Sequence, residues 1–511
     1  MSIDLGNNRL SVGNQLVRAA WRYPNKEAIV CKGKRVTFRE LNDRANSLAH
    51  GLMNLGIRKG DFVAIILMNC VEFVETYYAL AKIGAIAAPQ NYRLTPNDIE
   101  RLINQCEAKA LVYGSDFKDL VGGLRAKLKS VKNYIYVGEG EVEDTIPYKD
   151  LIIGHSTGEP NVEIFQDDGQ YMMYTSGTTG LPKAAVMTHF NNLMAVSQVA
   201  FEMGIDSSWV LMTVFPLFHR VGCVTTLAGV TVGCKNVITE IDPQQILENI
   251  EKEKVNFVNL VPVMMNLFMM VPDFEKYDMS SLKMIVYAAA PLTTEVREAT
   301  EKYFTKNIAE YYGNSESSVL VFSNPEMKRT HPTSIGTPAF GVNLRLVDEK
   351  GVDVPIGEIG EIIARSPAMN ANYYKNPEKT KKDLVDGWFH MGDLGKFDED
   401  RHLYIVGRVE DLIISGADKI FAPEVEDLIQ IHPKVEQCAV IGLPDKTLGK
   451  IATAVVTLRS GEQIDEKEII DYCKGKIADF KIPKKVKIID AIPRTATGKA
   501  LKYQLVEKFS E

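Results

Sequence analysis

The sequence has no apolar run long enough to cross a membrane. Its longest apolar stretch, "VNLVPVMMNLFMMVP" at residues 258–272, contains Asn and Pro and is shorter than the roughly 18 apolar residues expected of a transmembrane helix. The opening "MSIDLGNNRL" lacks the charged-then-apolar pattern of a secretory signal, and the closing "EKFSE" is not a peroxisomal signal. We therefore expect a cytoplasmic protein without a transmembrane segment.

Cysteine is scarce, and its spacing excludes the usual cysteine motifs. The 7 cysteines are scattered, and no two form a C-x-x-C pair. Such spacing argues against a disulfide framework and against a structural zinc site. His219, Cys223 and Cys234 could surround a metal, but buried free thiols are the favoured interpretation. This cysteine usage is typical of a reducing compartment.

The charge pattern offers no nucleic-acid signature. The formal net charge is −7 over 511 residues, whereas nucleic-acid binding usually needs a clustered basic face. An apolar fraction of 45% and a charged fraction of 24% are typical of globular enzymes. No amphipathic basic helix requires a membrane, so peripheral membrane contact stays open. The oligomeric state is also open, with a homodimer as one option.

Strand-like and helix-like segments alternate along most of the chain. The apolar run "FVAIILM" (62–68) has strand length, and "VEFVETYYALAKIGA" (71–85) has helical spacing directly after it. A second run of this kind covers about 170–330. Alternation of this type predicts α/β sheets with parallel pairing. Gly and Pro punctuate residues 342–366, which predicts short antiparallel strands there, and the last 100 or so residues are typical of a small separate α+β unit.

The stretch "YTSGTTGLPK" (174–183) combines glycines, hydroxyls and a closing lysine. A flexible linker is the plain interpretation, but β-forming residues precede the stretch, and a strand and a helix are expected after it. Gly177 and Gly180 allow backbone N–H groups to face one concavity, which suits an anion. Lys183 adds a cation. The spacing differs from G-x-x-x-x-G-K-[ST], so the pattern predicts a phosphate cradle of another kind.

Seven motifs in order resemble those of the adenylate-forming superfamily, which includes acyl-CoA synthetases, luciferases and peptide-synthetase adenylation domains. They are "YTSGTTGLPKAAVMTH", "PLFHRVG", "YYGNSES", "SIGTP", "GWFHMGDLG", "GRVEDLIISGADKIFAPEVE" and "PRTATGK". They span nearly the whole chain, and their texture resembles the acyl-CoA synthetase or fatty-acid–CoA ligase branch. The resemblance implies a large N-terminal domain (1–407), a hinge (408–410) and a small mobile α+β lid domain (411–511).

The resemblance implies two half-reactions that use ATP, Mg²⁺ and CoA. A carboxylate attacks the α-phosphate to give an acyl-adenylate and pyrophosphate, and a thiol then displaces AMP. Charge that develops on the phosphate needs preorganised cations and N–H donors. Glu316 would hold Mg²⁺, which prefers oxygen ligands, and Lys499 would reach the α-phosphate. The implied catalytic residues are Lys499, Glu316, Thr179 and His219.

The nucleotide contacts are likewise implied by the resemblance. Tyr312 would stack on adenine, Asp393 would accept hydrogen bonds from the ribose hydroxyls, and Arg408 would approach the ribose and phosphate edge. Relatives often have Gly-Gly where this chain has Ala289 and Ala290, which puts the fine adenine geometry in question. The full set is Thr175, Ser176, Gly177, Thr178, Thr179, Lys183, Ala289, Ala290, Tyr311, Tyr312, Gly313, Ser315, Asp393, Arg408 and Lys499.

The thiol site and the hinge follow from the same comparison of motifs. Glu410 takes the hinge position, where large φ/ψ changes would be absorbed. CoA would contact Arg93, Ser415, Gly416, Ala417 and Lys481, with Arg93 near the 3′-phosphate. Ala417 and Leu448 depart from the family pattern and put the detailed CoA contacts in question. A solvated basic face is the plain alternative for Lys481 and its neighbours.

The acyl pocket is expected around the "PLFHRVG" segment. Its residues would be His219, Val221, Gly222, Ala288 and Gly313. The segment has no Asp for a substrate ammonium, and an unpaired buried ammonium is costly, so an α-amino acid is disfavoured. A medium- or long-chain fatty acid is preferred.

Several alternatives stay open. The acid could be aromatic or alicyclic, and the acceptor could be the phosphopantetheine of a carrier protein. A relative that has lost its chemistry and a luciferase-type oxygenase are further options. Arg220 could meet a second carboxylate of the substrate, but an outward-facing surface arginine is the favoured interpretation.

Overall fold

A computed structural model describes residues 10–175, 183–370, 372–416, 418–494 and 500–510. Two compact units share the chain. The first comprises Met1–Leu344 and Ala364–Phe389, and the second comprises Arg345–Ile363 and His390–Glu511. Among the described residues, every helix is too short or too polar to cross a membrane.

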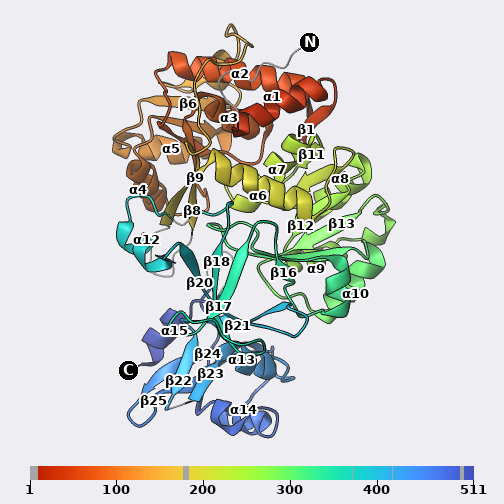
Figure 1. Ribbon diagram of the computed structural model, residues 1–511, viewed down its shortest axis with the longest axis vertical. Coiled ribbons are helices and arrows are strands. Elements are labelled where there is room, and N and C mark those ends of the chain that lie inside the picture. Colours follow the sequence, from red (N-terminus) through yellow and green to blue (C-terminus); the bar gives the residue numbers. More distant parts are fainter. Residues whose placement is uncertain (1–9, 176–182, 371, 417, 495–499, 511) are drawn as a thin grey trace. The chain divides into compact units, whose positions relative to one another are not determined.

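The first unit contains a nine-stranded sheet and a seven-stranded sheet (Figure 1). The nine-stranded sheet is parallel at its centre, and antiparallel pairs close both edges. In spatial order its strands are β16 (Thr337–Pro338), β15 (Val321–Ser323), β14 (Ile308–Tyr312), β13 (Met284–Tyr287), β12 (Phe257–Leu260), β10 (Val210–Thr213), β11 (Lys235–Ile238), β1 (Glu27–Cys31) and β2 (Lys34–Thr37).

The seven-stranded sheet is parallel except for its last pair, β8 and β9, which are antiparallel. Its three central strands are apolar along their whole length, as expected of strands covered on both faces. In spatial order they are β7 (Ile146–Pro147), β6 (Asn133–Val137), β5 (Ala110–Gly114), β3 (Phe62–Ile66), β4 (Ile86–Pro89), β8 (Gly169–Thr175) and β9 (Lys183–Thr188).

Helices cover both faces of each sheet. The largest apolar core joins one face of each sheet to the helices between them, α1 (Val12–Arg22), α2 (Phe38–Asn54), α3 (Val71–Ile83), α6 (His189–Glu202) and α7 (Arg220–Val232). The opposite face of the nine-stranded sheet packs on α8 (Pro243–Glu253), α9 (Pro262–Met269) and α10 (Thr294–Tyr303). The opposite face of the seven-stranded sheet packs on α4 (Pro96–Cys106) and α5 (Lys118–Leu124). Two short helices, α11 (Pro325–Thr330) and α12 (Pro377–Asp383), complete the unit.

Local signals fix where the central helices begin. Thr188 caps α6 through a capping box with Asn191, which satisfies orphan N–H groups of the first turn. The ring of His189 is buried and accepts a hydrogen bond from the backbone N–H of Val12 at 3.1 Å, which ties α1 to α6. Helix α7 is buried almost throughout despite many β-branched residues, so packing outweighs intrinsic helix propensity here.

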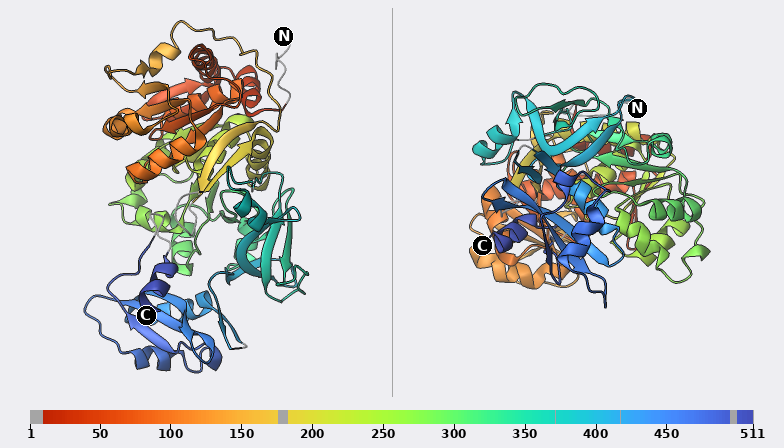
Figure 2. Two further views of the ribbon diagram at one scale, coloured as in Figure 1. Left: turned by 90° about the vertical axis from the view of Figure 1, so that its left-hand side faces the viewer. Right: turned by 90° about the horizontal axis from the view of Figure 1, so that it is seen from below.

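The second unit holds most of a five-stranded sheet and all of a C-terminal sheet. The first consists of β17 (Asn343–Val347), β18 (Gly360–Arg365), β20 (Trp388–Phe397), β19 (Leu384–Val385) and β21 (Leu403–Arg408). The C-terminal sheet consists of β23 (Asp418–Phe421), β22 (Leu412–Ser415), β25 (Gly449–Leu458), β24 (Val435–Asp445) and β26 (Lys485–Ile488). Helices α13 (Ala422–Gln430) and α14 (Glu466–Cys473) pack on one face of this last sheet, and α15 (Lys502–Phe509) packs on the other (Figure 2).

The expected fold class is confirmed: the chain is α/β, with parallel sheets first and a small α+β segment last. Short strands lie in the region 342–366 as expected, namely β17 and β18, and an isolated antiparallel bridge joins Val347 to Asp353 there. In the compact units, residues 345–363 and 390–407 group with the C-terminal segment, and the domain boundary at residue 407 stays a prediction. A hinge at 408–410 stays a prediction.

Candidate active site

The hydroxyl- and glycine-rich loop joins two antiparallel strands. Strand β8 ends at Thr175, which pairs with Lys183 at the start of β9, and α6 follows β9. The expected strand before the loop and the expected strand and helix after it are therefore present. Six predicted site residues lie outside the described residues: Ser176, Gly177, Thr178, Thr179, Ala417 and Lys499. The position of Thr175 is known from its backbone alone.

Glu316 lies in a tightly held loop that follows β14. Asn314 and Ser317 exchange hydrogen bonds, each accepting from the other's backbone N–H. A Cβ on Gly313 would lie 1.8 Å from the Ser318 carbonyl oxygen, so only glycine fits there. The Glu316 side chain is buried, and its Oε1 accepts a hydrogen bond from the Tyr373 hydroxyl at 2.9 Å.

Lys183 lies on the same side of the fold as Glu316, with Tyr373 between them. Its Nζ is 5.4 Å from the centre of the Tyr373 ring. Burial lowers the pKa of Lys183, and the neighbouring charge of Lys379 lowers it further. Among the residues that the structure describes, no carboxylate forms an ion pair with this ammonium. The carboxylates of Asp383 and Glu316 act on it electrostatically. A carboxylate and an ammonium that contact one aromatic side chain are the kinds of group that bind Mg²⁺ and phosphate.

An apolar cavity of about 180 Å³ lies beside the loop that follows β14 and carries Glu316. Helices α6 and α7 form one wall, and strands β12, β13 and β14 with the turns after them form the other. Four of the predicted pocket residues line it: His219, Val221, Ala288 and Gly313. Tyr311, Ala289 and Ser315, which the resemblance assigned to the nucleotide, line it as well.

Gly222, the fifth predicted pocket residue, has a packing role instead. It is not among the lining residues. A Cβ at this position would lie 2.5 Å from the Pro216 carbonyl oxygen and 2.7 Å from that of Phe215. The glycine therefore lets α7 approach the backbone that leads into it, and its small size does not enlarge the cavity.

His219 is the residue before the first turn of α7, and its imidazole is open to the cavity. The side chain makes no capping bond. The residue is exposed where it faces the cavity. The protein packed around it nevertheless lowers the pKa of His219 through desolvation, and the charge of Arg93 acts in the same direction. The imidazole is therefore neutral near pH 7.

The expectation for Arg220 is wrong: its side chain points inward. Only 4% of it is exposed, because Arg220 is the first residue of α7 and faces α6. Its guanidinium donates to the Asn192 side chain, while Nε and Nη2 have no partner among the described residues. Burial lowers the pKa of Arg220. Its ionisable neighbours, Cys223 first among them, are neutral, since burial raises the pKa of that thiol to about 11.

Polar groups that the sequence interpretation missed lie within the cavity wall. Asn259 of β12 is 5% exposed, donates to the Tyr311 hydroxyl at 3.4 Å, and has no partner for its Oδ1 among the described residues. Burial raises the pKa of Tyr311 to about 12, so this phenol keeps its proton. Thr225 of α7 also lines the cavity. An Asn inside the apolar run "FVNLV" was the available signal.

The alanine pair at the expected adenine position carries backbone strain. Ala289 has φ = 73°, a left-handed conformation that favours glycine. This explains why Gly-Gly would suit the turn, and it locates the departure at a single residue. Ala289 and Ala290 are exposed, and Tyr312 is half-buried.

In the second unit, one arginine, Arg408, contacts both the predicted ribose residue Asp393 and the predicted hinge residue Glu410. Asp393 of β20 is the register partner of Arg408 of β21. The Arg408 Nε lies 3.1 Å from the Asp393 carboxylate, and its Nη1 lies 3.5 Å from Glu410. The backbone N–H of Val409 donates to the Gly392 carbonyl at 2.9 Å. The first two residues of the predicted hinge, Arg408 and Val409, are thus held to the sheet.

The residues predicted for CoA are spread over both units. Arg93 is exposed in the turn after β4 and lies against Tyr92. Ser415 is buried, and Gly416 has φ = 64° and donates its N–H to the Leu448 carbonyl at 2.8 Å. The Lys481 ammonium lies 2.7 Å from the Glu424 carboxylate. A phosphate at Lys481 would therefore compete with Glu424.

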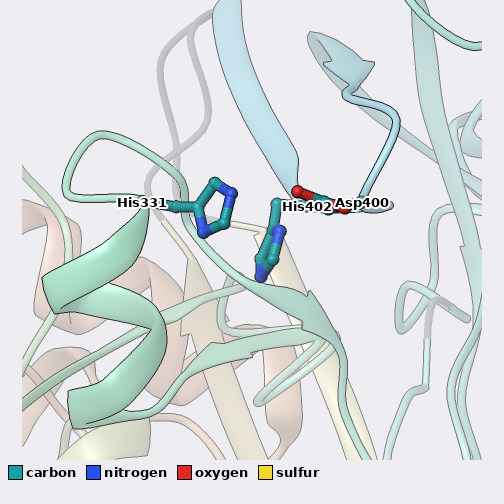
Figure 3. A group of neighbouring side chains, drawn as sticks. All are labelled: His331, Asp400 and His402. Atoms are coloured by element: carbon teal, nitrogen blue, oxygen red, sulfur yellow. The ribbon is translucent and has the colours of Figure 1, made fainter.

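Among the described residues, cysteines and histidines form no metal centre within either unit. All 7 cysteines are free, and Cys223 and Cys234 are buried, as the thiol interpretation expected. Figure 3 draws His331 with Asp400 and His402. His331 belongs to the first unit and the other two to the second, and the positions of the units relative to one another are not determined. We assign no site to this group.

Comparison with known proteins covers both parts of the chain. The model of a family described as "AMP-binding enzyme" matches residues 16–374, and one described as "AMP-binding enzyme C-terminal domain" matches residues 424–499. Long-chain-fatty-acid–CoA ligase FadD13 of Mycobacterium tuberculosis is 33% identical and is covered over 93% of both chains.

Two further relatives cover nearly the whole chain. Feruloyl-CoA synthase of an Amycolatopsis species is 32% identical over 98% of this chain and 99% of its own. The solved structure of o-succinylbenzoate coenzyme A synthetase (MenE) from Bacillus subtilis, in complex with ATP and magnesium ion, is 27% identical. It covers 96% of this chain and 99% of its own, with a TM-score of 0.83.

Proposed function

Since the chain belongs to the AMP-binding enzyme family and is an ATP-dependent acyl-CoA ligase, we propose that it activates a compact carboxylic acid, either medium-chain aliphatic or aromatic. The resemblance stated from the motifs is confirmed, as are the cofactors ATP and Mg²⁺ and the co-substrate CoA. Our proposal therefore concerns the identity of the acid.

The size of the cavity carries this proposal. Its volume of about 180 Å³ lies below the roughly 300–1,000 Å³ of sites for drug-sized ligands. A long alkyl chain would need more room than this cavity offers. Among the relatives, FadD13 is named for long-chain fatty acids and another for ferulate. The cavity favours the compact end of this range.

The lining chemistry supports the same acid class. No carboxylate is among the described lining residues, so a substrate ammonium would lack a partner. At the wall, Asn259 and Tyr311 offer hydrogen bonds to a polar group on the acyl part. A substrate hydroxyl could donate to the Asn259 Oδ1. An aromatic acid with a hydroxyl or a medium-chain acid with a polar terminus would satisfy this wall better than a plain alkyl chain.

We assign roles to the residues as follows. Neutral His219 borders the acyl group without adding charge. Lys183 lies at the phosphates, and Glu316 would hold Mg²⁺, which neutralises phosphate charge when bound. Lys499 remains our candidate for the α-phosphate. Asp393 and Arg408 bind the ribose edge, Glu410 is the hinge, and Arg93 with the Gly416 strand contacts CoA. We also propose a cytoplasmic location.

The test is pyrophosphate release with ATP and Mg²⁺ across a panel of acids. The panel includes short, medium and long fatty acids, cyclohexane carboxylate, benzoate, hydroxylated cinnamates and amino acids, each with and without CoA, beside Lys499→Ala. We expect CoA-dependent turnover on medium or aromatic acids that is lost in the variant. Preference for long-chain acids would overturn the size argument, and turnover on a carrier protein but not on CoA would reassign the acceptor.

A second class of acid is favoured by one observation. Arg220 lines the cavity as a buried cation without a carboxylate partner, and uncompensated buried charge is costly. A second carboxylate on the substrate would compensate it. Dicarboxylic acids therefore belong in the panel. Preference for a monocarboxylic acid over its matched dicarboxylic acid would exclude this class.

A further inference from the structure

Tyr373 lies where the two halves of the predicted phosphate site meet. It forms an isolated β-bridge with Ala185 of β9, and the backbone N–H of Tyr374 donates to the Ala184 carbonyl at 2.7 Å. The segment that carries Tyr373 is thus attached to the strand that begins at Lys183. Only 6% of Tyr373 is exposed.

The hydroxyl of Tyr373 holds the Glu316 carboxylate. The O–H donates to Oε1 at 2.9 Å, and a tyrosine hydroxyl is protonated at neutral pH. Hydrogen bonds from neutral donors to carboxylates are charge-assisted and directional. The Glu316 backbone carbonyl also accepts from the N–H of Asn370, at 3.1 Å. Asn370 therefore fixes the backbone of Glu316, and Tyr373 fixes its side chain.

The ring of Tyr373 supports the ammonium of Lys183. The 5.4 Å between Nζ and the ring centre is within the range of a cation–π contact. On the adjoining helix α12, Lys379 pairs with Asp383. The charge of Lys379 still acts on Lys183, but Lys183 is the cation whose Nζ lies over the Tyr373 ring.

We propose that Tyr373 is a positioning residue that sets the spacing between the Glu316 carboxylate and the Lys183 ammonium, and so prepares the site for a divalent cation bound to phosphates. The inference rests on the proposed function for the roles of Glu316 and Lys183. The hydroxyl orients the metal-binding carboxylate, and the ring places the phosphate-binding cation. Partners that orient a metal ligand are typically worth about 10–100-fold in metal affinity.

The experiment separates the hydroxyl from the ring. Calorimetric titration of the full-length protein with ATP at a series of Mg²⁺ concentrations gives metal dependence without turnover. We expect Tyr373→Phe to raise the Mg²⁺ concentration at half-maximal ATP affinity by about 10-fold, with metal-free ATP affinity unchanged. Tyr373→Leu, which also removes the ring, should in addition weaken metal-free ATP binding by about 3-fold.

Tyr374→Phe is the matched control. This neighbouring tyrosine packs on Phe62 with ring centres 5.3 Å apart and should leave the Mg²⁺ dependence unchanged. If Tyr373→Phe behaves like Tyr374→Phe, a space-filling role is sufficient and the inference is overturned. Unfolding midpoints of all variants show whether a change in binding merely follows lost stability; a binding change that scales with lost stability also overturns it.

Glu316→Gln distinguishes this inference from the proposed function. If Glu316→Gln shifts the Mg²⁺ dependence and Tyr373→Phe does not, only the role of Tyr373 fails. If neither variant shifts it, Glu316 is not a ligand of the cation, and the proposed metal assignment fails with the inference. If both shift it, combining them should add little, because the two groups act as one unit.

Discussion

Arg408 of β21 lies opposite Asp393 of β20, with its Nε 3.1 Å from the aspartate carboxylate. The same guanidinium approaches Glu410 at 3.5 Å. The residue proposed for the ribose is therefore held in place by an arginine that also contacts the proposed hinge residue. The proposed ribose contact and the proposed hinge therefore share one cation.

Asp393→Asn should weaken ATP binding about 10-fold, because a hydrogen bond to a charged acceptor is worth roughly 1.5–3 kcal/mol. Calorimetry with ATP measures the effect. Glu361→Gln is the control, since Glu361 contacts His390 at 3.0 Å in the same sheet but has no proposed nucleotide contact. Equal losses for the two variants would mean that the sheet was disturbed and that Asp393 has no specific role.

Ala289→Gly should stabilise the protein by about 1 kcal/mol, because φ = 73° is unfavourable for a residue with a Cβ. Urea unfolding at equilibrium gives the free energy. Ala288→Gly, at a position without positive φ, should instead cost about 0.5–1 kcal/mol. A destabilised Ala289→Gly variant would show that packing of the Ala289 methyl group contributes more free energy than the backbone strain costs.

Gly313→Ala should destabilise the first unit by about 3 kcal/mol, because the added Cβ would lie 1.8 Å from the Ser318 carbonyl oxygen and the loop would have to move. The Glu316 carboxylate would move with it, so ATP binding should weaken as well. Gly122→Ala makes a clean comparison, since nothing lies within 4 Å of its Cβ position and alanine favours the helix there. Similar unfolding curves for both variants would contradict the packing argument.

Acid should destabilise the first unit through His189. Burial lowers the pKa of this histidine from 6.5 to about 4, so the unfolded state binds more protons than the folded state below about pH 6.5. Stability is then fully present above pH 6.5 and is lost as the pH falls toward 4, by about 2 kcal/mol at pH 5. His189→Asn, which keeps an acceptor for Val12 but does not titrate, should show a flatter pH profile in urea unfolding between pH 7 and 5. An unchanged slope would assign the acid sensitivity to other groups.

The sequence predicted those parts of the site that depend on order and residue type. Local pattern and motif order predict the strand that ends at Thr175 and the strand and helix that begin at Lys183. They also predict the buried free thiols and the α/β fold. Side-chain positions that depend on tertiary packing were harder to predict from the sequence. Arg220 looks like a surface residue because arginine usually is one, and only the contact of α7 with α6 shows that its side chain points inward.

The glycines and the polar wall illustrate the same limit. Gly222 and Gly313 are the same residue type in the sequence, but their places differ. Gly222 packs against backbone carbonyls outside the cavity lining, whereas Gly313 lines the cavity. Asn259 is missed because a single polar residue in an apolar strand gives no sign of which side chain faces a cavity. By contrast, the sequence alone marked Ala289 as unusual, because relatives often have glycine there. The positive φ of Ala289 is a local backbone property of the kind that glycine favours.

The hydrogen bond from Val12 to His189 joins residues 177 positions apart, and α1 packs against both helices that wall the cavity. The cavity wall is therefore two layers thick, and its outer layer is the first helix of the chain. Substitutions in residues 12–22 would shift α6 and α7, and through them the shape of the cavity, without a direct contact to the substrate. We therefore expect substitutions in the amino-terminal helix to alter the preference among acids, although no residue of that helix lines the cavity.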